Sequence, residues 1–370
     1  MRICIVADSN SEHTIRLVSY LASRKHEVHL ICLKKRSDLP DNIQKYELRN
    51  FRLPLFREFM WLLQTKKLVQ HINPDVIDGH YISVYGFIAA FTGFHPLIIT
   101  AWGSDLLINP RQNPIWKFTC KYAISHADKV ICLFPLEIAK EALLKLNADL
   151  SKIETYYLGV DTNQFRHLAD CVDMKADFGI SLSSPIVINV RGLAPVYDVD
   201  TFLKAMPIVL KAIPQTEFIV MYNIREKNTV LKLSEQFQNI KNLKFIENIP
   251  HSKMPRLLSM ADIYVSTSIS DGASNALFEA MACELPTIVT DIPANKYWIT
   301  DEENGLLFKP FDYEALAKKL IFLLQNKQLQ ELFGNRSRKI IIEKVEQNVQ
   351  MANVERIYQK LSRNVCDIRK

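Results

Sequence analysis

Two carboxylates, Asp271 and Glu279, stand eight positions apart where a short apolar strand is expected to turn into a helix. Asp271 follows the strand, and Glu279 lies about one turn inside the helix. A helix N-terminus favours bound phosphate by roughly 0.3–1 kcal/mol when exposed, and a carboxylate accepts each sugar hydroxyl at about 1.5–3 kcal/mol. The spacing suits a nucleotide-sugar, although spacing alone fits a capped core helix with two incidental acids better. The residues expected to form the turn and first helical positions are Gly272, Ala273, Ser274 and Asn275.

The segment as written resembles the signature of the retaining glycosyltransferases of family 4, a branch of the GT-B fold. In that signature, two acids separated by seven residues open a Glu-Ala-Met-Ala helix, as Asp271 and 279–282 do here. The resemblance implies an α/β protein with two Rossmann-like, doubly wound parallel-sheet domains facing a cleft. Further family-like stretches follow in family order along nearly the whole chain, at 127–128, 158–165, 191–193, 285–291 and 304–307.

The resemblance also implies an activity. The chain is expected to be a glycosyltransferase of hexosyl type that moves a sugar, with retention, from a UDP- or GDP-sugar to a glycan or lipid-linked acceptor. Such an enzyme would serve cell-surface polysaccharide or glycolipid biosynthesis. The alternative is a catalytically silent GT-B protein that binds a nucleotide-sugar or a partner.

Site residues of the second domain follow from the same resemblance. Asp271 would face the donor sugar hydroxyls, Glu279 the ribose diol, and Arg191 the departing diphosphate. The family has a lysine six positions after this arginine, but here the residue is Tyr197, which brings no charge. Arg225 follows the next expected strand and either replaces that charge or is a surface arginine.

The first domain would hold the acceptor, and four of its residues are candidates for that site. His80 follows a buried strand, and His13 opens the first helix after a polar loop. Trp102 replaces a histidine that approaches the donor sugar in many family members. Asp105 is expected to orient an acceptor hydroxyl, with a loop-capping aspartate as the alternative.

No metal and no cofactor are expected. Asp198-Val-Asp200 looks like a metal-binding pair, but it opens an amphipathic helix, where acids favour the dipole and cap the terminus. A nicotinamide or flavin dehydrogenase needs glycines at its first strand–helix turn, and no glycine precedes Gly79. A phosphorylase would need a lysine-held pyridoxal phosphate or a phosphate pocket, and neither is apparent.

Composition adds broad limits. The 370 residues exceed what one core usually organises, so two domains are expected. A net charge of +6 permits acidic substrates or anionic lipid without requiring nucleic acid. Seven cysteines without a Cys-x-x-Cys pair favour a reducing compartment. With no secretion signal at Arg2, a cytoplasmic protein is expected, peripheral to the inner face of the membrane if it binds lipid.

Strands and helices are expected to alternate in two halves. The predicted domains are 1–165 for the acceptor, 166–349 for the nucleotide-sugar, and a helix at 350–370 that crosses back. The uncharged run 79–104 is read as a buried helix and strand rather than a membrane span, because His95-Pro96 and polar residues break it. Strands are expected at 2–7, 27–33, 76–79, 97–101, 129–133, 153–157, 186–190, 217–221, 243–246, 263–266 and 287–290.

One segment of the first half, 49–67, predicts a membrane-facing surface. It carries five basic residues against the single acid Glu58, interleaved with aromatic residues. Basic and aromatic residues together are typical of an interfacial helix, although the aromatic residues also fit the buried side of an ordinary helix. A second basic and aromatic group stands at 111–121.

Overall fold

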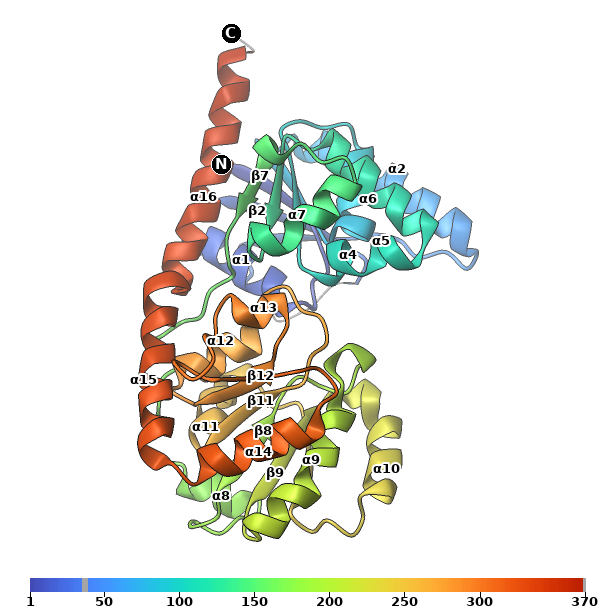
Figure 1. Cartoon of the computed structure of the whole chain (residues 1–370). Coiled ribbons are helices and arrows are strands. Elements are labelled where there is room, and N and C mark those ends of the chain that lie inside the picture. Colours follow the sequence, from blue (N-terminus) through green and yellow to red (C-terminus); the bar gives the residue numbers. More distant parts are fainter. Residues whose placement is uncertain (35–38, 369–370) are drawn as a thin grey trace. The chain divides into compact units, whose positions relative to one another are not determined.

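The computed structural model describes residues 1–34 and 39–368 as two compact units, each built on its own parallel sheet (Figure 1). Unit 1 comprises Met1–Leu158 together with Asn348–Lys370, and unit 2 comprises Gly159–Gln347. These divisions fall a few residues before the predicted boundaries at 165/166 and 349/350. The assignment of acceptor and donor to the two units stays a prediction.

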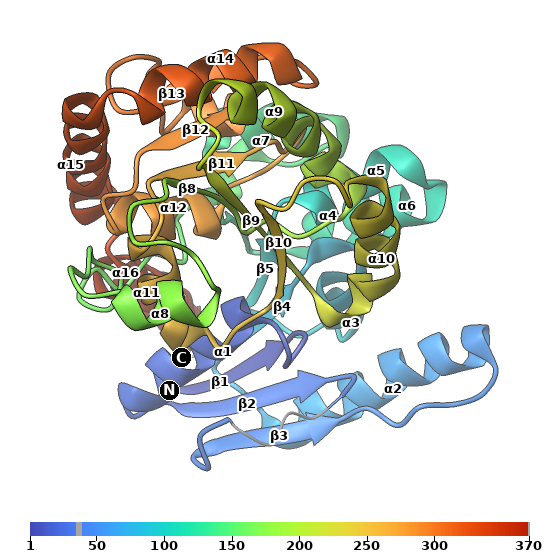
Figure 2. The ribbon, with the colours of Figure 1, turned by 90° about the horizontal axis from the view of Figure 1, so that it is seen from below.

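Unit 1 contains a seven-stranded parallel sheet in the order β3-β2-β1-β4-β5-β6-β7 (Figure 2). Its central strands are apolar runs without alternation, which is typical of strands that helices cover on both faces. The strands are β1 (Arg2–Val6), β2 (Glu27–Cys32), β3 (Ile43–Glu47), β4 (Val76–His80), β5 (Leu97–Ala101), β6 (Lys129–Cys132) and β7 (Ile153–Thr155).

Helices cover both faces of this sheet. On one face, α1 and α16 share a buried apolar cluster with β1 and β2. On the other, η1 is a π-helix that approaches β5 at Gly86, and α3 follows it directly. The helical elements of unit 1 are α1 (Glu12–Ser23), α2 (Pro54–Ile72), η1 (Ile82–Gly86), α3 (Phe87–Phe91), α4 (Ser104–Leu107), α5 (Asn109–Gln112), α6 (Pro114–His126), α7 (Leu136–Lys145), η2 (Leu150–Lys152) and α16 (Gln347–Ile368).

Buried polar contacts fix the last helix, α16, to unit 1. The hydroxyl of Tyr358 donates to the carboxylate of Asp78 in β4, and both side chains are fully buried. The Glu355 carboxylate accepts from Tyr20 Oη at 3.1 Å and from His26 Nε2 at 2.9 Å. Because buried polar groups need partners, these contacts specify where the helix packs as well as stabilising it.

Unit 2 contains a six-stranded parallel sheet in the order β10-β9-β8-β11-β12-β13. Its strands are β8 (Ile186–Asn189), β9 (Glu217–Tyr222), β10 (Leu243–Glu247), β11 (Ile263–Ser266), β12 (Thr287–Thr290) and β13 (Leu306–Phe308). Its helical elements are α8 (Val172–Asp177), η3 (Pro195–Tyr197), α9 (Val199–Ala212), η4 (Ile224–Glu226), α10 (Lys227–Gln236), η5 (His251–Lys253), α11 (Met254–Ser259), α12 (Asn275–Ala282), α13 (Pro293–Lys296), α14 (Tyr313–Leu324) and α15 (Lys327–Lys344).

Every strand predicted from the sequence is present in the structure, with ends that differ by no more than two residues. Two strands escaped prediction, β3 and β13, and both lie at a sheet edge. β3 is mostly exposed or half-buried, and β13 has only three residues. An edge strand of this kind has too few buried residues to stand out in the sequence, and its pairing with a neighbour defines it.

No helix in the described part of the chain is long and apolar enough to cross a membrane. The uncharged run 79–104 instead spans the end of β4, then η1, α3 and β5. The predicted helix of this run begins as a π-helix rather than an α-helix, because Tyr81, with φ of 60°, turns the chain just before it.

Among the glycines of unit 2, Gly334 of α15 packs most tightly against the backbone of another segment. A Cβ at this position would lie 2.0 Å from the carbonyl oxygen of Glu284, which follows α12. We expect Gly334→Ala to lower the free energy of unfolding by about 1–3 kcal/mol, as overpacking does. Chemical denaturation measures the loss. The neighbouring exposed Asn335→Ala is the control, and equal stability of the two variants would contradict this account of the packing.

Candidate functional site

Arg191 and Asp271, far apart in the sequence, form an ion pair in unit 2. Arg191 follows β8, and its Nη2 lies 2.5 Å from Asp271 Oδ2. Each side chain is 13% exposed, so water screens the pair little. Burial lowers the pKa of Arg191, but the groups around it, Asp271 first and then Tyr264, Tyr197 and Glu279, together outweigh burial and raise this pKa. The guanidinium is therefore a fixed positive charge at the carboxyl end of a parallel strand, where ligands of such sheets bind.

Tyr197 holds the flat face of this guanidinium. The carbon Cζ of Arg191 lies 4.5 Å from the centre of the Tyr197 ring, which is a cation–π contact. The Arg191 Nε is buried and has no hydrogen-bond partner among the described residues. The side chain that replaces the family lysine thus adds no charge, but it orients the charge that remains.

Glu226, which sequence reasoning missed, fastens the turn after Arg191. Its carboxylate accepts from the backbone N–H of Leu193 at 2.9 Å and of Asn223 at 2.8 Å. Gly192 takes a left-handed φ of +81°, which a side chain rarely adopts, and faces the same carboxylate. Arg225 lies beside it, exposed, and no contact of its guanidinium is found within the described ranges.

The helix that carries Glu279 begins as the sequence predicts. Ser274 is the N-cap of α12, and its hydroxyl accepts from the Leu277 N–H at 3.3 Å. Asp271 accepts from the Gly272 N–H at 3.0 Å, so it belongs to the turn that leads into the helix. Ala273 and Asn275, the other predicted residues of this turn, are half-buried beside it.

Glu279 is 5% exposed, and its Oε1 lies 2.8 Å from His251 Nε2 of η5. A buried carboxylate without a partner would be costly, and the imidazole supplies a hydrogen bond. Sequence reasoning missed His251, because 28 residues separate it from Glu279 and no motif surrounds it. The ring of His251 also packs against Phe165, with centroids 5.0 Å apart.

The capping prediction for Asp198 and Asp200 is wrong in detail. Asp198 occupies the N-cap position of α9, but its carboxylate caps no backbone N–H and instead accepts from the Thr201 hydroxyl at 2.6 Å. Its left-handed backbone, with φ of 42°, accompanies this arrangement. Asp200 forms an exposed ion pair with Lys204 at 2.6 Å. Within residues 1–34 and 39–368, no group of three His, Cys, Asp or Glu side chains could hold a metal ion.

In unit 1, two of the four predicted residues, His13 and His80, contact the indole ring of a third, Trp102. The ring of Trp102 lies edge-on to His13 at 5.1 Å, to His80 at 5.8 Å and to Tyr81 at 6.0 Å between centroids. His80 is almost fully buried, and its Nε2 donates to Asp78 Oδ2 at 3.2 Å. His80 Nδ1 and Trp102 Nε1 are buried without a partner in the described structure.

Asp105 holds the loop that carries Trp102 through hydrogen bonds to backbone N–H groups. The carboxylate is fully buried and accepts from the backbone N–H groups of Ile82, Trp102 and Gly103 at 2.8, 3.0 and 2.8 Å. Burial raises the pKa of Asp105, and these three bonds oppose the rise. The observed contacts are those of the loop-capping alternative, and a role toward an acceptor hydroxyl stays a prediction.

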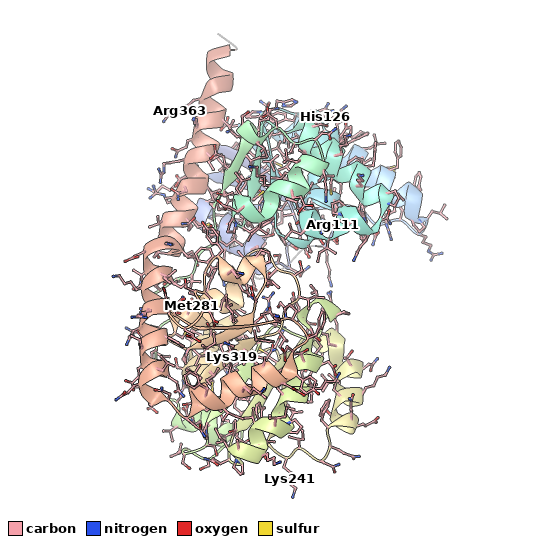
Figure 3. All side chains as sticks on the ribbon, viewed as in Figure 1. Arg111, His126, Lys241, Met281, Lys319 and Arg363 are labelled. Atoms are coloured by element: carbon pink, nitrogen blue, oxygen red, sulfur yellow. The ribbon has the colours of Figure 1, made fainter. Side chains whose placement is uncertain are left out.

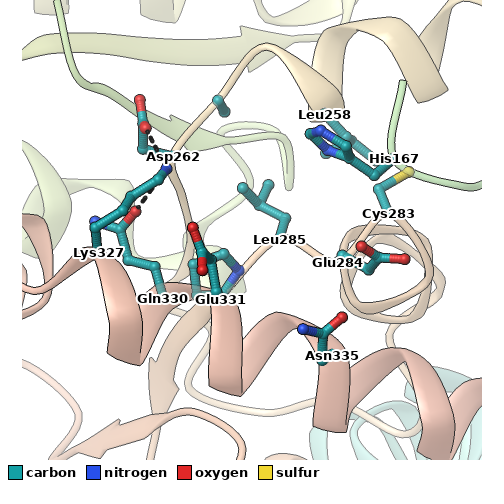
Figure 4. Close-up of a pocket in the computed structure, with 12 residues that line it drawn as sticks. His167, Leu258, Asp262, Cys283, Glu284, Leu285, Lys327, Gln330, Glu331 and Asn335 are labelled. Carbon is teal, nitrogen blue, oxygen red and sulfur yellow. Dashed lines mark hydrogen bonds and ion pairs between the residues drawn. The ribbon is translucent and has the colours of Figure 1, made fainter. Parts of the chain in front are cut away.

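A cavity of about 280 Å³ in unit 2 contains none of the predicted donor residues (Figure 4). It is lined by Leu258 of α11, by residues 261–262 before β11, by residues 283–286 after α12 and by α15, with Lys327 Nζ 3.6 Å from Asp262 Oδ1. The Cys283 thiol at its wall is buried, which raises the pKa of Cys283 to about 12. A buried thiol of this kind stays protonated at neutral pH.

Two family descriptions match the chain. "Glycosyl transferases group 1" matches residues 173–340, and "Glycosyl transferase 4-like" matches residues 2–133. The first match covers Arg191, Asp271 and Glu279. The second covers His13, His80 and Trp102.

Among curated proteins, the chain is similar to N-acetyl-alpha-D-glucosaminyl L-malate synthase of Bacillus anthracis, 24% identical over 372 residues that cover 93% of this chain and 92% of that protein. It is also 24% identical, over 87% of its length and 86% of the other, to the UDP-Gal:alpha-D-GlcNAc-diphosphoundecaprenol alpha-1,3-galactosyltransferase of Escherichia coli.

Among solved structures, the Anabaena protein Alr3699/HepE in complex with UDP and glucose superimposes with a TM-score of 0.81. The alignment covers 98% of this chain and 100% of that one at 16% identity, which shows the fold alone. With two parallel-sheet units and two family matches in chain order, the protein belongs to the group 1, or family 4, glycosyltransferases and has the GT-B fold.

Proposed function

We propose that this glycosyltransferase moves a sugar from a nucleotide-sugar to a glycan or lipid-linked acceptor, with retention and without a metal ion. UDP is the favoured nucleotide, because the Escherichia coli relative is named for UDP-Gal and the Anabaena neighbour holds UDP. The same relative is named for a diphosphoundecaprenol acceptor, which supports the lipid-linked class. GDP is the alternative nucleotide.

The observation that carries the proposal is the oriented, buried guanidinium of Arg191. Asp271 holds one edge of it, Tyr197 covers its face, and its Nε is left without an acceptor. A buried N–H without a partner calls for an explanation. A diphosphate oxygen supplies one, and the N-terminus of α12 adds its dipole.

Transfer then follows from these positions. The bond between the anomeric carbon and the diphosphate oxygen breaks, the acceptor hydroxyl oxygen bonds to the anomeric carbon from the same face, and the hydroxyl proton passes to the departing diphosphate. Arg191 stabilises the charge that grows on the departing diphosphate, which is the kind of interaction that contributes most to catalysis. Asp271 accepts from donor sugar hydroxyls and Glu279 from the ribose diol. Because Asp271 is one methylene shorter than the usual glutamate, the sugar preference of Glu-bearing relatives need not apply.

Unit 1 supplies the acceptor side in this proposal. His80 Nδ1 and Trp102 Nε1 are two further buried donors or acceptors without a partner, and both belong to the group around the Trp102 indole. Leaving each unpaired costs about 1–3 kcal/mol, which an acceptor hydroxyl would recover. His13 at the rim of the same group and Asp105 beneath it keep the indole in place.

Donor hydrolysis across UDP- and GDP-sugars tests the proposed function. We expect slow release of the nucleoside diphosphate from one donor, at a rate nearly unchanged by EDTA or added Mg²⁺, because Arg191 and the α12 dipole replace a metal. Loss of activity in EDTA would require Asp198 and Asp200 as ligands. If calorimetry shows that a donor binds but neither hydrolysis nor transfer to any acceptor occurs, the catalytically silent alternative is favoured.

The cellular setting is part of the same proposal. We place the enzyme in the cytoplasm, where nucleotide-sugars are made, at the inner face of the membrane, and in cell-surface polysaccharide or glycolipid biosynthesis. Fractionation of cells that express the protein at its native level would test this placement.

A further inference from the structure

Unit 1 carries an aromatic groove of about 390 Å³ that the proposed chemistry does not use. Helices α2 and α6 form its walls, and η1 and α3 form its floor. Among the residues that line it are Phe59, Trp61, Phe87, Trp116 and Phe118. A volume of this size is typical of a site that holds an apolar ligand.

The rim of this groove exposes large apolar side chains to water. Phe59 is 51% exposed, Phe118 63% and Ile115 68%, and Leu53 and Phe56 lie at the start of α2, also exposed. Phe118 packs edge-on to Phe87 with centroids 6.5 Å apart, so the rim is held in place. Contiguous exposed apolar surface of this kind marks an interaction site rather than an ordinary surface.

Basic residues lie on the helices that form the groove and on neighbouring elements. Arg111, which Figure 3 labels, and Lys117 line a hollow of about 510 Å³ on the other side of α6, and none of its lining residues is acidic. A third cation there, Lys145, pairs with Glu141. Arg52, Lys66, Lys67 and Lys121 are exposed on the same helices or next to them.

One basic residue of the predicted membrane segment is packed rather than projecting. The Arg57 Cζ lies 5.0 Å from the centre of the Trp61 ring, and its guanidinium approaches Glu58 at 3.9 Å. Arg57 therefore stabilises the wall of the groove. The charge available to a partner comes from the other cations around it.

We propose that this surface, the aromatic groove with its basic surroundings, docks on an anionic phospholipid bilayer. Phenylalanine and tryptophan rings enter the interface while lysine and arginine side chains meet lipid phosphates. A second copy of the chain fits less well, because a symmetric dimer would bring the same cations face to face. The inference rests on the proposed function and deepens it, since it places the acceptor on a membrane.

The floor of the groove leads toward the predicted acceptor residues. Ser83 of η1 lines the groove, and the amide of Asn109 donates to Ser83 Oγ at 3.2 Å and to Tyr81 Oη at 3.1 Å. Tyr81 in turn contacts Trp102 and follows His80. The head of an acceptor anchored in a bilayer at this groove would thus meet polar groups that belong to the proposed site.

Vesicle co-sedimentation of the full chain tests the charge requirement. We expect binding to phosphatidylcholine vesicles that contain phosphatidylglycerol, weakened by salt, and no binding to phosphatidylcholine alone. Each basic residue contributes about a fivefold factor near anionic lipid, so Arg111→Gln with Lys117→Gln should lower partitioning about 25-fold. The matched control is Lys232→Gln with Lys241→Gln, two exposed lysines of unit 2, and it should bind as the unaltered chain does.

The aromatic requirement has its own pair of variants. Phe59→Ser with Phe118→Ser should lower partitioning about tenfold or more, because two aromatic side chains no longer enter the interface. The control is Phe311→Ser with Phe322→Ser, whose side chains in unit 2 are 64% and 53% exposed. Circular dichroism and nucleotide binding should be unchanged in both pairs, which shows that they fold.

Several outcomes would overturn the inference. These are no sedimentation with anionic vesicles at low salt, equal loss in groove and control variants, or a concentration-dependent dimer that the Phe59 and Phe118 changes dissociate. Failure of the proposed function is a separate result. A chain that binds vesicles but hydrolyses no donor leaves the docking surface standing, and a chain that hydrolyses donor without binding vesicles removes only the surface.

Discussion

Arg191→Ala is expected to lower kcat by roughly 10²–10³, because it removes the charge that we propose stabilises the departing diphosphate. Tyr197 in the position of the family lysine makes this dependence strong. The Arg191 guanidinium contacts both the Tyr197 ring and the Asp271 carboxylate, so these two side chains hold its orientation. Single-turnover transfer at saturating donor measures the effect on the chemical step.

The variant also leaves Asp271 buried without its partner, which destabilises a protein by about 3–5 kcal/mol in comparable pairs. Thermal melting must therefore accompany the kinetics. Arg191→Lys keeps the charge but loses the planar contact with Tyr197, and it should recover part of the rate and most of the stability. An unchanged kcat with a raised KM in folded Arg191→Ala would show that Arg191 binds the donor uniformly and does not act on the leaving group.

Glu279→Ala is expected to weaken nucleoside diphosphate binding by about 2–3 kcal/mol, as removal of a charged hydrogen-bond acceptor does. Glu279 is buried on α12 and already held by His251, so its carboxylate meets a ligand without reorganising. Calorimetry with UDP and with GDP, in the absence of any sugar, isolates the ribose contact. Affinity that is unchanged in a folded variant would remove Glu279 from the donor site.

Two companions sharpen this test. Glu235→Ala changes an exposed acid on α10 of the same unit and should leave affinity alone. His251→Ala keeps the carboxylate but removes the imidazole that positions it, and we expect a smaller loss than for Glu279→Ala. A loss as large as that of Glu279→Ala would mean that His251 contacts the nucleotide itself.

The tyrosine at position 197, where the family has a lysine, changes how the neighbouring charge of Arg191 is held. A lysine there would add a second, mobile charge, whereas the Tyr197 ring fixes the single charge of Arg191 by a cation–π contact. Glu226 adds to this by holding the turn that follows Arg191 through two backbone N–H groups. In the proposed donor site, leaving-group stabilisation would therefore depend on the orientation of one charge rather than on the number of charges.

Periodicity in the sequence was enough to predict the buried strands of both sheets. Runs such as Ile186–Asn189 and Ile263–Ser266 are apolar at nearly every position, because helices cover both faces of a parallel sheet. The edge strands β3 and β13 lacked this signal. The sequence also predicted a turn at 272–275 before a helix, and the structure makes Ser274 the N-cap of that helix, α12.

The family itself was also legible in the sequence, since Asp271, Glu279 and Arg191 stand in its motifs and in its order. The chain alone determined which residue types the donor side offers. Tertiary structure decided which of them touch: Arg191 pairs with Asp271 across 80 positions, and His251 meets Glu279 across 28. Such contacts arise because parallel strands bring their carboxyl ends to one edge of a sheet, whatever their separation along the chain, and no local pattern records that approach.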